Sequence, residues 1–147
     1  MTPKISATSN CAVIGYGSWA TAIVKLLCEN EHKVWWYVAT PAVKEHIQTR
    51  GHNHKYLPSI SFSKEQIVVS ERLDEVVSAA DIIILAVPSA FLTSVLQPLT
   101  VSLADKFVVS AIKGIIADDY QTVSEYLHSH YGLPYDNIGV ITGPTHA

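Results

Sequence analysis

The sequence has 147 residues, of which 48% are hydrophobic and 16% charged, and its formal net charge is -3 at pH 7. This length suits one domain with a filled core, and the composition argues against a disordered segment. The acidic balance, with no local cluster of Lys or Arg, gives no electrostatic footprint for nucleic acid. Apolar runs fall well short of the roughly 20 residues of a membrane span, so membrane insertion is not expected.

The N-terminal residues, the cysteines and the histidines indicate the cellular setting and whether a metal is expected. The first ten residues, MTPKISATSN, are polar and lack the apolar block of a secretory signal. We interpret residues 1–10 as a polar lead-in and residues 11–147 as one domain. Cys11 and Cys28 are the only cysteines, which favours a reduced, cytoplasmic setting over a disulfide framework. The seven histidines have no carboxylate or thiolate at ligand spacing, so no metal site is predicted.

Short β-branched runs alternate along the chain with longer segments of helical periodicity. The expected strands are Cys11–Ile14, Lys33–Val38, Ile67–Ser70, Ile82–Val87, Phe107–Ala111 and Ile138–Ile141. The expected helices are Ser18–Asn30, Ala42–Arg50, Leu73–Ser78, Ala90–Leu99 and Tyr120–Tyr131. The segment His52–Ser63 is expected to be an ordered loop lying over the domain. This alternation predicts an α/β, Rossmann-like doubly wound fold, with a mostly parallel sheet and helices on both faces.

A glycine-rich turn follows the first expected strand and opens the first expected helix. The segment GYGSWA, from Gly15 to Ala20, matches the pattern G-x-G-x-x-G/A. Gly15 permits a tight turn, Gly17 lets the backbone approach a pyrophosphate, and Ala20 lets the helix pack closely on the strand. Free N–H groups at the start of the helix then face the phosphates. A tight turn without a ligand also fits the pattern, but this placement favours a dinucleotide.

The sequence does not choose between NAD and NADP. About 20 residues after such a motif, an acidic residue usually binds the ribose 2′-hydroxyl of NAD, or an Arg accepts the 2′-phosphate of NADP. The second expected strand instead runs into Ala39 and Thr40, which carry no charge. Thr40 and Lys44 offer a hydroxyl and a cation, but both are interpreted as ordinary surface residues.

Four further segments accompany the glycine turn: NHKYLP at Asn53–Pro58, VPS at Val87–Ser89, AIKGI at Ala111–Ile115 and GPTHA at Gly143–Ala147. With GYGSWATA, in this order and at this spacing, they resemble the N-terminal domain of bacterial-type NAD(P)-dependent glycerol-3-phosphate dehydrogenases. The resemblance implies hydride transfer between a nicotinamide and dihydroxyacetone phosphate. The product is sn-glycerol 3-phosphate, which enters glycerophospholipid synthesis.

The resemblance also implies roles for individual residues. Cofactor contacts are implied for Gly15, Gly17, Ser18, Trp19, Lys113 and Ala147. Substrate contacts are implied for Lys113, Gly143 and Thr145, with Lys113 as the catalytic candidate. Lys113 comes just after an apolar strand, at the carboxyl edge where this fold binds ligands. A lysine there neutralises a phosphate or polarises a carbonyl, although a solvated lysine in a strand-end turn would look the same.

Plain structural interpretations compete with some of these roles. Ser18 is expected to cap the first helix in addition to contacting phosphate. Trp19 begins the apolar face of that helix and is alternatively a core residue. Tyr56, within NHKYLP, is interpreted as packing of an ordered loop and is not assigned to the site.

Members of this family carry their principal catalytic lysine in an all-helical C-terminal domain, which these 147 residues do not include. We therefore expect the chain to bind dinucleotide but to turn over little substrate. A further domain would cover apolar surface on this chain. Two copies of the chain could instead pair through that surface, so a homodimer is possible. Two alternatives remain: a non-catalytic dinucleotide-sensing module, and another two-domain dehydrogenase acting on a hydroxy acid or acyl substrate. A sensor would have no reason to carry AIKGI and GPTHA.

Overall fold

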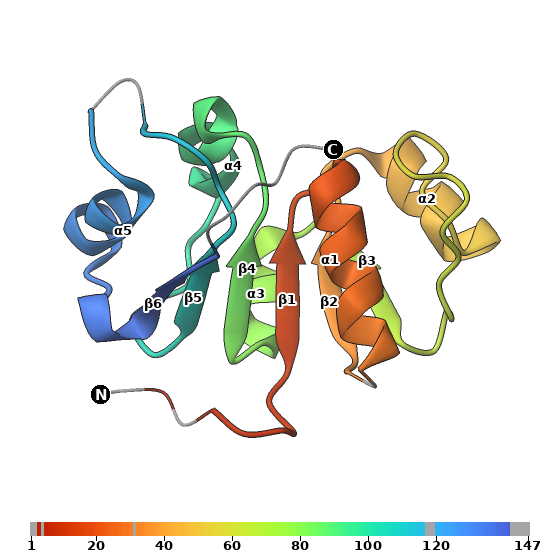
Figure 1. The fold of residues 1–147 in the computed structure, drawn as a ribbon, viewed down its shortest axis with the longest axis horizontal. Helices are drawn as coiled ribbons and strands as arrows, with labels where there is room; N and C mark the ends of the chain where they lie inside the picture. Colours follow the sequence, from red (N-terminus) through yellow and green to blue (C-terminus); the bar gives the residue numbers. More distant parts are fainter. Residues whose placement is uncertain (1–2, 4, 31, 117–119, 142–147) are drawn as a thin grey trace.

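The computed structural model describes residue 3 and residues 5–30, 32–116 and 120–141, and Figure 1 shows them as one sheet with helices packed around it. The strands are β1 (Cys11–Ile14), β2 (Val34–Tyr37), β3 (Ile67–Ser70), β4 (Ile82–Leu85), β5 (Phe107–Ser110) and β6 (Ile138–Val140). The helices are α1 (Ser18–Glu29), α2 (Pro41–Arg50), α3 (Leu73–Ala79), α4 (Leu92–Leu96) and α5 (Val123–Tyr131). Short 3-10 turns occupy Ser89–Phe91 (η1) and Tyr135–Asn137 (η2).

The strands of the sheet run in the order β3-β2-β1-β4-β5-β6, and the paired strands are parallel. The chain moves outward from β1 to β3 and then crosses back to place β4 on the other side of β1. Ile14, the last residue of β1, pairs with Tyr37 of β2 and Leu85 of β4. This confirms the predicted Rossmann-like doubly wound fold. The carboxyl ends of β1 and β4 border the crevice where the strand order reverses, which is where open α/β sheets bind ligands.

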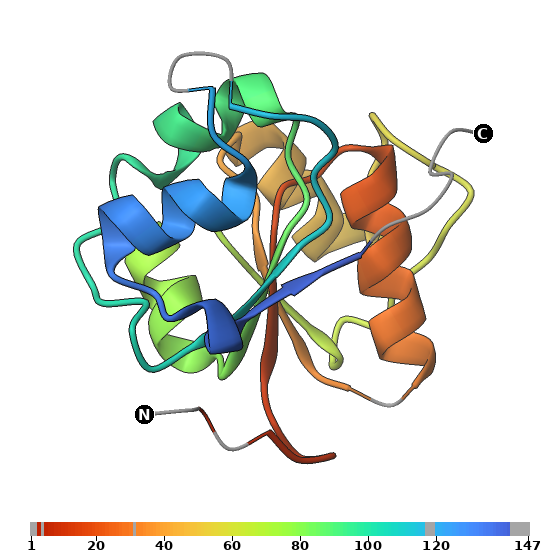
Figure 2. The ribbon, with the colours of Figure 1, turned by 60° about the vertical axis from the view of Figure 1, so that its left-hand side comes forward.

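The hydrophobic core consists of two clusters, one on each face of the sheet. Ala12 and Ile14 belong to one cluster with residues of α3, α4 and α5, whereas Val13 belongs to the other with residues of α1 and α2. The alternation follows from the two-residue period of a strand. Figure 2 shows α1 on one side of the sheet and α3 and α5 on the opposite side. Coverage of both faces explains why the central strands are almost continuously apolar.

Two helices are shorter than the sequence predicts. The segment expected to be helical from Ala90 to Leu99 divides into η1 and α4, and α4 ends at Leu96. Pro98 lies two residues later and has no backbone N–H with which to continue the helical hydrogen bonds. The helix expected from Tyr120 begins at Val123. A capping box between Thr122 and Glu125 fixes that start, because each side chain accepts a hydrogen bond from the other residue's backbone N–H.

The loop between α2 and β3 is ordered, as predicted. His52 and Ser61 form an isolated antiparallel bridge across it. The Lys25 ammonium on α1 donates to the Ser61 carbonyl oxygen at 2.9 Å, so the loop runs alongside α1. None of the helices in the described part of the chain has the length and apolar character that a membrane span requires.

Candidate functional site

The glycine turn begins with a close backbone contact between β1 and β4. Gly15 has φ +121°, and a Cβ built on it would lie 2.2 Å from the Ala86 carbonyl oxygen and 3.0 Å from Val87 Cγ1. Both the backbone conformation and the lack of space therefore require glycine. The indole N–H of the fully buried Trp36 on β2 donates to the Gly15 carbonyl oxygen at 2.6 Å. The turn is thus fixed to strands on both sides of β1.

Gly17 is the N-cap of α1, and open space lies in front of it. A Cβ on Gly17 would meet no atom within 4 Å, unlike one on Gly15. The sequence-based expectation that Ser18 caps the helix is wrong, because Ser18 is already the first helical residue and no side chain caps this end. The first turn of α1 contains no acidic residue. Its N–H groups are therefore available to an anion in the space beside Gly17.

Two cavities meet at this turn. The larger, of about 400 Å³, is lined by Gly15, Tyr16, Gly17, Tyr56, Ala86, Val87, Pro88, Phe91 and Val95. Its walls are mostly apolar and include three aromatic rings, and the rings of Tyr16 and Tyr56 meet edge to face with centroids 6.3 Å apart. The sequence alone does not assign Tyr16, Tyr56 or Phe91 to the site. The NHKYLP segment was the available signal, but its position over the glycine turn is a tertiary feature.

The second cavity lies on the β5 side of the glycine turn. It has a volume of about 260 Å³ and is lined by Gly17, Ser18, Trp19, Ala20, Ala86, Val87, Pro88, Ala111, Ile112 and Lys113. The structure therefore brings together Gly17, Ser18, Trp19 and Lys113, which the sequence places up to 96 positions apart (113 minus 17). Trp19 is 36% exposed and is not a core residue. Among these described lining residues Lys113 carries the only charge.

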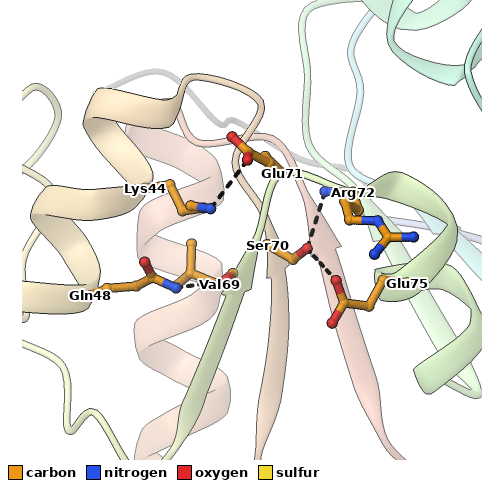
Figure 3. Close-up of polar contacts among 7 residues, drawn as sticks. All are labelled: Lys44, Gln48, Val69, Ser70, Glu71, Arg72 and Glu75. Carbon is orange, nitrogen blue, oxygen red and sulfur yellow. Dashed lines mark hydrogen bonds and ion pairs between the residues drawn. The ribbon is translucent and has the colours of Figure 1, made fainter.

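Polar contacts fix the edge of the sheet beyond β2. Figure 3 shows the Lys44 ammonium reaching from α2 to the Glu71 carboxylate, with N and O 3.3 Å apart. Ser70 Oγ donates to Glu75 at 2.8 Å and accepts from the backbone N–H of Arg72 at 3.1 Å. Lys44 is therefore paired with a carboxylate.

Thr40, at the N-cap of α2, also has a defined partner. Its hydroxyl forms a short hydrogen bond with the Tyr16 hydroxyl, so it is more than the ordinary surface residue expected from the sequence. The end of β2 is thereby joined to the glycine turn. The residues of the GPTHA segment, Gly143, Thr145 and Ala147 among them, lie outside the described residues.

Three histidines meet where α2 runs into the loop. His46 Nε2 lies 3.1 Å from His52 Nε2, and the rings of His46 and His54 have centroids 4.1 Å apart. Burial, followed by the neighbouring charges of His54, His52 and Arg50, lowers the pKa of His46 below its ordinary value of 6.5. Within the described residues, no group of three or more His, Cys, Asp or Glu side chains is arranged to hold a metal ion.

Comparisons with known proteins agree with this architecture. The family described as NAD-dependent glycerol-3-phosphate dehydrogenase N-terminus matches residues 10–147. The chain is 38% identical over 133 residues to glycerol-3-phosphate dehydrogenase (NAD(P)+) of Pseudomonas syringae pv. syringae, covering 90% of this chain and 38% of the relative. It is 35% identical over 136 residues to the enzyme of the same name from Alcanivorax borkumensis, covering 92% of this chain and 39% of the relative.

A crystal structure of glycerol-3-phosphate dehydrogenase from Coxiella burnetii has a similar fold. The TM-score is 0.82 at 25% sequence identity, over 96% of this chain and 42% of that chain. The fold with its glycine turn defines the protein as a Rossmann-type domain. The chain belongs to the NAD-dependent glycerol-3-phosphate dehydrogenase N-terminal family. It spans 38% and 39% of the lengths of the two curated relatives described above.

The two glycines of the turn should respond differently to alanine. Gly15→Ala places a methyl group against the Ala86 carbonyl oxygen in a left-handed backbone conformation, so we expect a loss of more than about 2 kcal/mol in the free energy of unfolding. Gly17→Ala meets no atom and has φ -73°, so we expect a change within about 0.5 kcal/mol. Urea unfolding of both variants measures this, and equal stabilities would contradict the assigned contact.

The histidine cluster should make stability depend on pH. Because the folded-state pKa of His46 is lowered, the unfolded chain binds a proton more readily, and the folded state loses stability as the pH falls below 6.5. We expect the unfolding temperature to decrease between about pH 7.5 and about pH 5.5, and His46→Gln to reduce that decrease. His32→Gln, outside the cluster, is the control. An identical pH dependence in the wild type and His46→Gln would exclude this role.

Proposed function

We propose that this chain binds NAD or NADP across the crevice at the strand-order reversal, as the nucleotide-binding part of an NAD(P)-dependent glycerol-3-phosphate dehydrogenase. The observation that carries the proposal is that two cavities share Gly17, one lined by three aromatic rings and the other by Trp19 and Lys113, with open space in front of Gly17. A dinucleotide has two unlike halves joined by a pyrophosphate. The uncapped start of α1 faces the position that the pyrophosphate would occupy.

The residues that line each cavity indicate which half of the dinucleotide it would hold. The larger cavity offers Tyr16, Tyr56 and Phe91, whose rings suit the adenosine half through apolar and stacking contacts. The smaller cavity contains Ser18, Trp19 and Lys113 and suits the nicotinamide half, since the cation that acts on the substrate must lie beside the reacting carbon. Gly15 and Gly17 would then contact the cofactor through their backbone.

Lys113 is the residue of the described chain best placed for the reaction. It follows β5 and is held by a turn in which Gly114 has φ +83°. When bound, the nicotinamide supplies or accepts the hydride. Lys113 would polarise the carbonyl of dihydroxyacetone phosphate or neutralise its phosphate, so that the ketone is reduced to sn-glycerol 3-phosphate. Substrate contacts from Gly143 and Thr145 and a cofactor contact from Ala147 stay predictions.

Family membership favours this function over a dinucleotide sensor or a hydroxy-acid dehydrogenase. The product would enter glycerophospholipid synthesis. Cys11 and Cys28 are free and buried, which supports a reduced, cytoplasmic setting. A homodimer stays a prediction.

Titration of the chain with NADH and NADPH in parallel tests the cofactor site. Neither an acid nor an Arg follows β2, and Lys44 is paired with Glu71, so we expect both to bind, with dissociation constants within about tenfold of each other. Energy transfer from tryptophan to the reduced nicotinamide reports binding. Gly17→Ala should keep the stability and lose affinity by about tenfold or more, because its methyl group enters the pyrophosphate position. Binding of neither nucleotide by the wild type would refute the proposal.

Binding of dihydroxyacetone phosphate to the chain saturated with NAD+ tests the substrate, because this ketone and the oxidised cofactor cannot react together. We expect Lys113→Met to weaken this binding by about tenfold or more, since the cavity loses its only charge. Pyruvate, a ketone without phosphate, is the control ligand. Tighter binding of pyruvate, or no effect of Lys113→Met, would count against this substrate. Calorimetry measures both.

A further inference from the structure

Asn53 is a fully buried polar residue in the loop that follows α2. Its exposed fraction is 0%, and it lies directly behind the glycine turn. Asparagine is rarely buried unless its amide is hydrogen-bonded, since an unsatisfied amide in the interior is costly. Figure 2 shows this loop passing the N-terminal end of α1.

The side-chain amide of Asn53 makes four hydrogen bonds, two as donor and two as acceptor. Nδ2 donates to the Tyr16 carbonyl oxygen at 2.8 Å and to Thr21 Oγ1 at 3.1 Å. Oδ1 accepts from the backbone N–H of Lys55 at 3.1 Å and of Tyr56 at 3.2 Å. The donors thus face the glycine turn and α1, whereas the acceptor holds the backbone of the loop. No other amide orientation satisfies these partners.

Three side chains donate hydrogen bonds to successive carbonyl oxygens of the glycine turn, and Asn53 binds the second of these oxygens. Trp36 Nε1 donates to the Gly15 oxygen at 2.6 Å, Asn53 Nδ2 to the Tyr16 oxygen, and Thr21 Oγ1 to the Gly17 oxygen at 2.7 Å. Of the three, Asn53 alone also holds the segment that carries Tyr56. Tyr16 and Tyr56 are both walls of the larger cavity.

We propose that Asn53 is a positioning residue for the dinucleotide: it joins the glycine turn to the Tyr56 loop, so that the aromatic cavity is formed before the ligand arrives. This rests on the proposed function, in which that cavity takes the adenosine half. Asn53 does not line the cavity itself and acts through Tyr16 and Tyr56. A site assembled in advance binds more tightly, because no ordering is required on binding.

The test compares dissociation constants of NADH and of ADP-ribose, which lacks the nicotinamide, well below the unfolding temperature of every variant. Asn53→Asp keeps the two acceptor bonds but turns an oxygen toward the Tyr16 carbonyl oxygen. We expect both ligands to bind about tenfold or more weakly, by the same factor. Thr21→Val removes one of the bonds to Asn53 and the bond to Gly17 while keeping the side-chain shape, and should weaken both by a smaller factor. Thr21→Val also tests the proposal if Asn53→Asp does not fold.

Leu127→Ala is the matched control for stability. Leu127 is fully buried in α5, within the core cluster on the opposite face of the sheet from α1. Leu127→Ala should lower the unfolding temperature and leave both dissociation constants unchanged. If Asn53 contributed to stability alone, Asn53→Asp would show the same pattern. Unchanged affinities in folded Asn53→Asp and Thr21→Val would overturn the proposal while the proposed function stands. Failure of the wild type to bind either ligand would overturn both.

Discussion

The close approach of Gly15 to the carboxyl end of β4 is the constraint on which the rest of the site depends. A side chain there would collide with the Ala86 carbonyl oxygen, so only glycine lets the turn lie against the neighbouring strand. The Ala86 N–H continues the ladder by donating to the Ile14 carbonyl oxygen at 2.9 Å. As a result the glycine turn and the VPS segment after β4 share the walls of both cavities.

The second feature of the site is that the glycine turn is held from behind by side chains distant in sequence. Trp36, Asn53 and Thr21 donate to its three consecutive carbonyl oxygens. With the acceptors satisfied inside the protein, the uncapped N–H groups at the start of α1 are left for an anion in the crevice. The buried part of the domain thus prepares a site whose ligand-facing surface is mainly backbone. Such a surface suits a pyrophosphate, whose oxygens accept hydrogen bonds from backbone N–H groups.

The fold was largely predictable, because local patterns dictate it. Continuous apolar strands such as the segment at 82–85 require coverage on both faces, and helical periodicity between strands requires crossovers. Errors occurred where a single residue changes a helix end: Pro98 beyond α4, and Thr122 with its capping box before α5. The expectation of a Ser18 cap failed for a related reason. Gly17 already occupies the N-cap, so Ser18 lies inside the helix.

The sequence by itself determined the Rossmann-like order of elements, the glycine turn and the position of Lys113 after a buried strand, because each depends on residues adjacent in the chain. Only the tertiary structure decided which residues wall the cavities. Tyr56 lies 40 positions after Tyr16 (56 minus 16), and the two rings meet because Asn53 bonds to both backbones. Likewise, Lys44 is paired because Glu71, which directly follows β3, lies beside α2. Contacts between distant segments depend on the packing of the whole sheet, which no local pattern encodes.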